Sequence, residues 1–279
     1  MNSMVMLGIY REQIFSPGKI RDDAAILDAS LLELSHLGYE VLTLQPEALD
    51  TISIQPACTL TMAKSDRALQ ILEEWQKSGT RVINSTRSIR NCYRKPLIHL
   101  LEEGHFPLPL SRFLPLEDVE QEISFKSHAK YWLKRWDTHA IEQGDVAKVT
   151  SRKELIRALR HFRHWKIEEV LVQEHLEGEV IKFYGVAGGQ YFSAFLSSNG
   201  DEVTSEMKQL STLAQQSAEV VGLEIYGGDA IMTGHGEIVL IDLNDWPSFS
   251  RCCRSAAKGI AKYITRVLEG GLHGSSSPR

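Results

Sequence analysis

The stretch GGDAIMTGHGEIVLIDLND, residues 227–245, has the pattern of a β-hairpin that carries oxygen-bearing side chains. Two apolar runs flank a turn rich in glycine, the residue that best accepts the positive φ of a tight turn. With His235–Gly236 as a two-residue loop, Asp229 lies directly opposite Asp242, roughly 5 Å away on the same face. Asn244 follows two residues later and shares that face. The sequence therefore predicts two carboxylates and one amide side by side on a sheet.

Such a cluster indicates a bound cation. Two facing carboxylates repel each other and lose hydration, which costs several kcal/mol unless a cation or protons offset it. Few ligands, all of them oxygen, suit Mg²⁺, which completes its coordination with water and substrate phosphates. The alternative is a solvated hairpin in which the aspartates merely alternate. A loop of another length would shift the pairing and remove the argument.

Composition limits the class of protein and its partners. The chain has 279 residues, 43% of them hydrophobic and 24% charged, as expected for a packed globular protein of two or three domains. Its net charge of -5 argues against a nucleic-acid partner held by the overall field. No basic segment precedes the first short apolar run, so we expect a cytoplasmic protein without a signal peptide or membrane span. The four cysteines form no C-x-x-C pair, so we expect neither a disulfide framework nor structural zinc.

The first third of the chain alternates strands and helices. We expect helices from Asp22 and over 65–77, and strands at residues 5–10, 40–44, near 60 and 81–84. This order predicts a small parallel sheet with helices on both faces. Ser88 is expected to cap a further helix that ends at Glu103.

The rest of the chain has the pattern of an α+β protein. Strands are expected at residues 131–136, 146–149, 170–173, 180–186 and 191–196, and helices at 151–164, 206–221 and 255–268. The helix at 151–164 carries five Lys and Arg residues, which we interpret as a solvated face. The Gly- and Ser-rich end is expected to be a flexible tail.

In the order of its predicted strands, helices and motifs, the segment from about Val82 to Ile264 resembles the ATP-grasp superfamily. The nearest branch contains glutathione synthetases, ribosomal-protein glutamate ligases and ATP-grasp inositol polyphosphate kinases. The most specific motif is IDLNDWPSF, Ile241–Phe249, which is similar to the family pattern of an acid, any residue, Asn and then a proline loop. The resemblance implies an α/β N-terminal domain plus α+β ATP-grasp domains, with ATP held between two β-sheets. It places the units at residues 1–86, 87–107 (a connecting helix), 108–176, 177–272 and 273–279 (the tail).

The resemblance also implies roles for individual residues. Asp229, Asp242 and Asn244 would hold one or two Mg²⁺ ions on ATP. The nucleotide would be bound by Lys95, Lys134 and Lys182, and by the hinge residues Gln173, Glu174, His175 and Leu176. Glu177 and Glu179 are both candidates for the acid that binds the ribose. We include Glu179 in the predicted nucleotide site. The family's glycine-rich phosphate loop is reduced here to Gly144, so His139 is a candidate for covering the phosphates.

The activity that the resemblance implies is an ATP- and Mg-dependent ligase that joins a carboxylate to an amine through an acyl phosphate. Lys134, Lys182 and Arg251 are the expected catalytic residues, because phosphoryl transfer needs positioning and charge neutralisation. An anionic small-molecule or peptide acceptor would meet Arg11, Ser16 and Arg254, although Arg254 fits a solvated helix start equally well. A small-molecule kinase is the alternative enzyme, and a non-catalytic ATP-binding regulatory protein is the second alternative. Neither a nucleic acid nor a membrane is expected as a partner.

Overall fold

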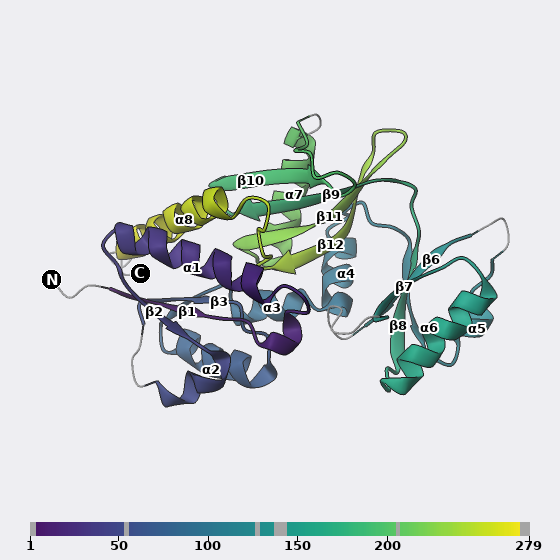
Figure 1. Cartoon of the computed structure of the whole chain (residues 1–279), viewed down its shortest axis with the longest axis horizontal. Helices are drawn as coiled ribbons and strands as arrows, with labels where there is room; N and C mark the ends of the chain where they lie inside the picture. The colour runs from purple at the N-terminus through teal and green to yellow at the C-terminus, as the bar shows by residue number, and fades with distance from the viewer. Residues whose placement is uncertain (1–3, 53–55, 126–128, 137–143, 205–206, 274–279) are drawn as a thin grey trace, which may run out of the picture.

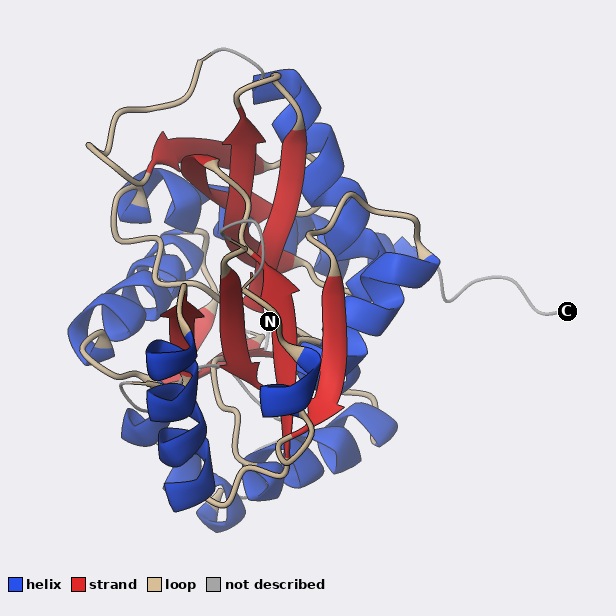
Figure 2. Ribbon diagram, turned by 90° about the vertical axis from the view of Figure 1, so that its right-hand side faces the viewer, coloured by secondary structure: helices blue, strands red, loops and turns tan. Residues whose placement is uncertain are grey.

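The computed structural model describes residues 4–52, 56–125, 129–136, 144–204 and 207–273, with side chains to residue 270. Figure 1 shows three sheets: β9–β12 lie above β1–β3, and the sheet that contains β6–β8 lies at the right-hand end of the molecule. Helices lie around the strands on the outside, as Figure 2 shows from the side. No helix in the described ranges combines the length and the apolar character that a membrane crossing requires.

The N-terminal sheet is parallel, as the alternating pattern predicts. Its order is β2-β1-β3-β4, formed by Val5–Ile9 (β1), Glu40–Leu44 (β2), Cys58–Thr61 (β3) and Arg81–Ile83 (β4). The helix α1, Ile20–His36, covers one face with its buried leucines, and α2, Asp66–Lys77, covers the other. Two short 3-10 helices, Gln13–Phe15 (η1) and Pro46–Thr51 (η2), follow β1 and β2.

Two helices, not one, connect this sheet to the rest of the chain. The prediction of a single helix capped by Ser88 is wrong: α3 spans Thr86–Asn91 and α4 spans Arg94–Glu103. The Ser85 side chain caps α3 by accepting from the Ser88 backbone N–H. Pro96 explains the break, because proline has no N–H for the preceding turn and fits only the first turn of a helix.

The small sheet is antiparallel and lies at one end of the molecule, on the right in Figure 1. Its order is β5-β8-β6-β7, formed by Ser111–Pro115 (β5), Tyr131–Arg135 (β6), Val146–Val149 (β7) and Glu169–Glu174 (β8). The helices α5, Val119–Glu122, and α6, Arg152–His164, bury one face in a separate core cluster. The strand β5 was not predicted, because prolines flank it. It is an edge strand, where proline is tolerated.

The large sheet is also antiparallel and has the order β10-β9-β11-β12. Its strands are Gly178–Val186 (β9), Tyr191–Leu196 (β10), Ile225–Thr233 (β11) and Ile238–Asp245 (β12). The helix α7, Met207–Val221, packs on one face. The helix α8, Cys253–His273, packs on part of the other face and also against α1, so one core cluster joins the large sheet to the N-terminal sheet.

The hairpin β11–β12 has the predicted pairing at the acids but reaches it differently. Asp229 pairs with Asp242, while Met232 pairs with Ile238, which leaves three loop residues between Thr233 and Glu237 rather than two. The register shifts after Asp229 because Ile241 is the extra residue of a β-bulge. The bulge offsets the longer loop, so the two aspartates still meet.

Candidate functional site

An inter-sheet cleft of about 510 Å³ lies between the small and large sheets. The strand β6 contributes Lys134 from one side, and β9, β11 and β12 contribute side chains from the other. Its charged and amide side chains are Arg94, Lys134, Glu177, Lys182, Asp229, Asp242 and Asn244. Its remaining side chains, mostly apolar, are Trp132, Val146, His175, Leu176, Val180, Ile231 and Ile241. A cavity of this size, mostly apolar with a few convergent charges, is typical of a ligand site.

The predicted acid cluster lines this cleft. Asp229 on β11 and Asp242 on β12 are directly paired across the hairpin, and Asn244 lies in the same cleft wall. The preceding Gly228 allows the close approach of the two strands, since a Cβ there would lie 2.2 Å from the Asp242 carbonyl oxygen. Within the described residues, no group of three or more His, Cys, Asp and Glu side chains could hold a metal. A cation here would therefore take two carboxylates and one amide oxygen, a donor set that fits Mg²⁺ with phosphate and water as its other ligands.

Lys182 forms an ion pair with one of these acids. Its Nζ lies 2.8 Å from Asp229 Oδ1, and the two residues are directly paired between β9 and β11. Partial burial lowers the pKa of Lys182, but the hydrogen-bonded charge of Asp229 more than offsets this and leaves the pKa raised. Lys182 is therefore protonated at neutral pH and brings a fixed positive charge to the acid cluster.

Lys134 is a buried cation on the opposite wall. It is 6% exposed, and its Nζ donates to Gln173 Oε1 at 2.8 Å. Burial lowers the pKa of Lys134 to about 8, and the Arg94 charge acts in the same direction, against the opposing carboxylates of Asp242 and Asp229. Gln173 does not line the cleft itself, but it fixes the amine that does.

The predicted hinge residues at the end of β8 line two different cavities. His175 and Leu176 line the inter-sheet cleft, whereas Glu174 lines a separate surface depression. Trp132 Nε1 donates to His175 Nδ1 at 3.1 Å, and His175 Nε2 lies 2.9 Å from the Lys148 ammonium and 3.3 Å from Glu177. Partial burial and the charge of Lys148 lower the pKa of His175, which keeps it neutral at pH 7.

The structure places Lys95 outside the cleft. Its ammonium pairs with Glu169 at 2.8 Å and lies over the rings of Phe113 and Trp136, and its side chain is 49% exposed. The neighbouring Arg94 lines the cleft instead, is 4% exposed and donates to the Arg135 carbonyl at 2.9 Å. The segment that the resemblance identifies does reach the cleft, through the residue one position earlier.

Three other predicted residues lie outside the cleft, and a fourth lies outside the described residues. Glu179 alternates with Gly178 and Val180 and so faces the other side of β9, whereas Glu177 lines the cleft. Arg251 donates to the Leu196 carbonyl at 3.2 Å on the β10 side, and Arg254 is exposed at the start of α8. His139 lies outside the described residues.

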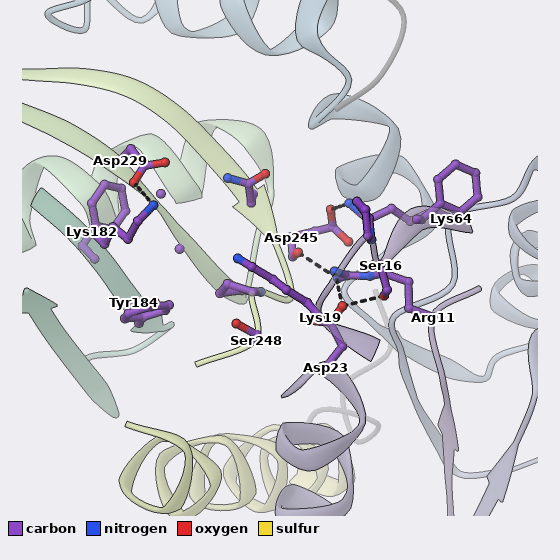
Figure 3. Close-up of a pocket in the computed structure, with 17 residues that line it drawn as sticks. Arg11, Ser16, Lys19, Asp23, Lys64, Lys182, Tyr184, Asp229, Asp245 and Ser248 are labelled. Atoms are coloured by element: carbon purple, nitrogen blue, oxygen red, sulfur yellow. Dashed lines mark hydrogen bonds and ion pairs between the residues drawn. The ribbon is translucent and has the colours of Figure 1, made fainter. Parts of the chain in front are cut away.

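A second, smaller pocket of about 250 Å³ adjoins the cleft and shares Lys182, Asp229 and Asn244 with it. We call it the interdomain pocket, because the N-terminal domain forms one wall and the β12 end forms the other. It contains Arg11 and Ser16, the two residues whose place after the first strand made them candidates for the acceptor. Figure 3 shows that its labelled residues face one another from the two walls: Arg11, Ser16, Lys19, Asp23, Lys64, Lys182, Tyr184, Asp229, Asp245 and Ser248.

Several of these residues were missed by the sequence prediction. Lys64 is 7% exposed and pairs with the buried Asp245 at 2.8 Å, across 181 positions of sequence. Arg11 donates to the Trp246 carbonyl at 2.6 Å and pairs with Asp23 at 3.2 Å. No local pattern marks Lys64 as buried. The one signal available was its place after β3, since ligands gather at the carboxyl ends of parallel strands.

Comparison by structure finds close likeness to known proteins over nearly the whole chain. D-Alanine–D-alanine ligase from Bacillus anthracis, complexed with ATP, has a TM-score of 0.73 at 13% identity, covering 96% of this chain and 100% of that chain. The RimK domain ATP-grasp protein from Sphaerobacter thermophilus has a TM-score of 0.73 at 18% identity, covering 93% and 99%. The ATP-grasp ligase PsnB, complexed with precursor peptide PsnA2 and AMPPNP, has a TM-score of 0.65 at 15% identity, covering 94% and 99%. No protein-family profile and no curated protein matches the sequence.

Proposed function

Because the chain has the ATP-grasp fold, we propose that it is an ATP- and Mg-dependent ligase that joins a carboxylate to an amine. The observation that carries the proposal is the arrangement of Asp229, Asp242 and Asn244 in a cleft between two sheets, opposite the buried Lys134. The cleft volume of about 510 Å³ is adequate for a nucleotide. The resemblance in sequence and the likeness in fold support the same ligand.

Different described residues would bind the adenine, the ribose and the phosphates. His175 and Leu176, with Trp132, form the apolar end of the cleft, where the adenine would lie. Glu177 is the acid within reach of the ribose, since Glu179 faces away. Lys134, Lys182 and Arg94 would neutralise the phosphates, with Arg94 in the role first assigned to Lys95.

Mg²⁺ held by Asp229, Asp242 and Asn244 would neutralise the β- and γ-phosphates of ATP. The transfer itself is a displacement. A carboxylate oxygen of the acceptor attacks the γ-phosphorus, the bond to the β-γ bridging oxygen breaks, and ADP leaves. Lys134 and Lys182 stabilise the charge that develops on the transferred group.

The acyl phosphate then reacts with the amine. The amine nitrogen attacks the acyl carbon, phosphate departs with the electrons of the C–O bond, and the nitrogen loses a proton to solvent. The interdomain pocket meets the inter-sheet cleft at Lys182, Asp229 and Asn244, so an acceptor there would lie beside the γ-phosphate. Positioning of this kind supplies much of the catalysis without a protein nucleophile.

The kinase alternative differs in its products. A kinase transfers the phosphoryl group to a hydroxyl and releases no phosphate, whereas the ligase releases ADP and phosphate together. The structural neighbours named as ligases favour the ligase. Phosphate and ADP measured in the same reaction distinguish the two.

The decisive experiment removes one acid of the proposed metal site. Asp242→Ala should abolish Mg-ATP-dependent ADP release, because one carboxylate cannot hold the ion against water. Glu179→Ala is the matched control, since this acid lies on the same sheet but outside the cleft, and it should keep activity. An Asp242→Ala enzyme that releases ADP at the wild-type rate, with a cooperative unfolding transition in both variants, would refute the proposal.

A further inference from the structure

The charges of the interdomain pocket form an incomplete set of ion pairs. Among the described residues that line it, four are cationic and three are anionic. Arg11 pairs with Asp23 at 3.2 Å, Lys64 with Asp245 at 2.8 Å, and Lys182 with Asp229 at 2.8 Å. Each acid thus neutralises one cation within the protein.

Lys19 is the remaining cation. It is exposed, lies at the start of α1, and has no ion pair with a described acid. Figure 3 shows its side chain reaching into the pocket between the Arg11–Asp23 wall and the strand that carries Lys182. The described lining therefore has a net charge of one positive unit, located on a flexible amine at the mouth of the site.

The other groups in the pocket are neutral. Tyr184 and Ser248, both almost buried, and Asn244 offer hydroxyl and amide groups rather than charge. The pocket has a volume of about 250 Å³, and a small molecule with further hydrogen-bonding groups fits such a space.

We propose that the interdomain pocket selects a small acceptor with one carboxylate and no ammonium, such as a hydroxy acid, and that Lys19 is its counter-ion. This inference rests on the proposed ligase function and specifies the acceptor. A dicarboxylate or a polyphosphate requires two or more cations that the protein does not already neutralise, because a buried unpaired anion is costly. Here the pairs of Arg11 and Lys64 would have to break to supply them, because Lys182 and Asp229 are assigned to the phosphates and the metal ion.

The test uses the full chain with Mg-ATP and hydroxylamine in place of the amine. An acyl phosphate and hydroxylamine give a hydroxamate and phosphate, so the trap reports carboxylate activation whatever the natural amine is. The panel contains lactate and glycolate as monoanions, glycine and D- and L-alanine as zwitterions with one carboxylate, glutamate and succinate as dicarboxylates, and inositol hexakisphosphate as a polyanion. We expect ADP release and hydroxamate with monoanions, at lower KM than with any zwitterion or dicarboxylate.

Variants of Lys19 separate this inference from the ligase proposal. Lys19→Gln should raise the KM of the monocarboxylate about tenfold, the effect of losing one charge-assisted contact, and leave the KM of ATP unchanged. Lys19→Arg should restore most of the loss. Lys262→Gln, on the outer side of α8, is the control and should change neither constant.

Each result decides between the two proposals. A preference for zwitterions, dicarboxylates or the polyphosphate, or an unchanged acceptor KM in Lys19→Gln, overturns the inference and leaves the ligase in place. No ADP release with any member of the panel, together with no binding of Mg-ATP, overturns the proposed function itself. Lys19 is exposed, so its substitution should not prevent folding, and a cooperative unfolding transition verifies this.

Discussion

Lys134 owes its position in the cleft to one amide. Its Nζ donates to Gln173 Oε1, and Gln173 Nε2 donates to Ser111 Oγ at 3.1 Å. Ser111 in turn donates its proton to the Pro109 carbonyl, at 2.8 Å, so its oxygen is left to accept. Because Ser111 Oγ accepts from the amide nitrogen of Gln173, the amide oxygen of Gln173 points toward Lys134. A neutral partner is consistent with the lowered pKa of Lys134, which a carboxylate at the same place would raise.

We predict that Mg-ATP binding weakens as the pH rises through about 8. The pKa of Lys134 in the free protein is about 8, and phosphate binding favours its charged form, so below this pH the amine is already protonated. Above it, binding requires uptake of a proton, and the affinity should fall by up to about tenfold per pH unit. His175 titrates below its usual range and does not contribute there. Calorimetric titrations from pH 7 to 9.5 measure this dependence, and Lys134→Met should show weaker, pH-independent affinity.

Substitution of Gln173 should shift the pH dependence of the Mg-ATP affinity. Gln173→Glu places a carboxylate against the Lys134 amine, so the pKa of Lys134 should rise and the loss of affinity should begin at higher pH. Gln173→Leu leaves a buried amine without its hydrogen bond and should cost about 1 to 3 kcal/mol of unfolding free energy. Ser111→Ala, which leaves the Lys134 contact intact, should have the smaller effect. Identical pH profiles for Gln173→Glu and the wild type would show that Gln173 does not govern the lysine.

At the scale of the elements, a buried ion pair holds β12, the strand of the proposed metal site, to the N-terminal domain. Lys64, in the loop after β3, pairs with Asp245 at the end of β12, and both side chains are at most 8% exposed. Arg11 adds a bond from the loop after β1 to the Trp246 carbonyl. These contacts fix the end of the strand on which Asp242 and Asn244 lie.

Removing one partner of this pair should be strongly destabilising. Lys64→Met leaves the Asp245 carboxylate buried without its cation, and we expect a loss of about 3 to 5 kcal/mol in urea unfolding. The double variant Lys64→Met, Asp245→Leu removes both charges and should recover most of that loss. A cost below about 1 kcal/mol for Lys64→Met alone would indicate that the pair is solvated and does not hold the strand.

The elements also show what the sequence could and could not predict. Periodicity located most strands and helices to within a few residues, and the pairing of Asp229 with Asp242 is confirmed. The loop count behind that pairing is wrong, because a bulge at Ile241 has no local signature in an apolar run. Arg94 and Lys95 are neighbours about 100° apart around α4, so resemblance found the segment but not the side chain that faces the cleft.

Contacts between distant segments were beyond the sequence altogether. The pairing of Lys64 with Asp245 joins residues 181 positions apart, and each residue alone has the pattern of an ordinary surface charge. In the interdomain pocket, three ion pairs form between residues that are not neighbours in the sequence, and Lys19 is the cation that none of these pairs includes. Charge counts along the chain cannot reveal these pairs, because neutralisation depends on which groups meet in space.

At the scale of the whole molecule, two bodies face each other across the cleft. One core cluster joins the N-terminal sheet, α1, α8 and part of the large sheet, whereas the small sheet buries a separate cluster beneath α5 and α6. The described contacts between the bodies include the Arg94 bond to the Arg135 carbonyl and the Lys95–Glu169 pair. The small sheet stands apart at one end of the molecule in Figure 1. A ligand that touches both walls should therefore stabilise the arrangement of the whole chain.

We predict that Mg-ATP stabilises the protein against heat and that ATP without Mg²⁺ does so much less. At a ligand concentration 100 times Kd, linkage gives about 2.7 kcal/mol, which for a chain of this size corresponds to a rise in Tm of roughly 5 °C. Without the ion, Asp229 and Asp242 repel the phosphates, so a chelator should remove most of the rise. Hydrogen exchange should slow in both β6 and β9 when Mg-ATP binds, because the ligand contacts both sheets. Protection confined to one sheet, or an equal rise in Tm in the presence of chelator, would contradict a nucleotide held between them through a metal ion.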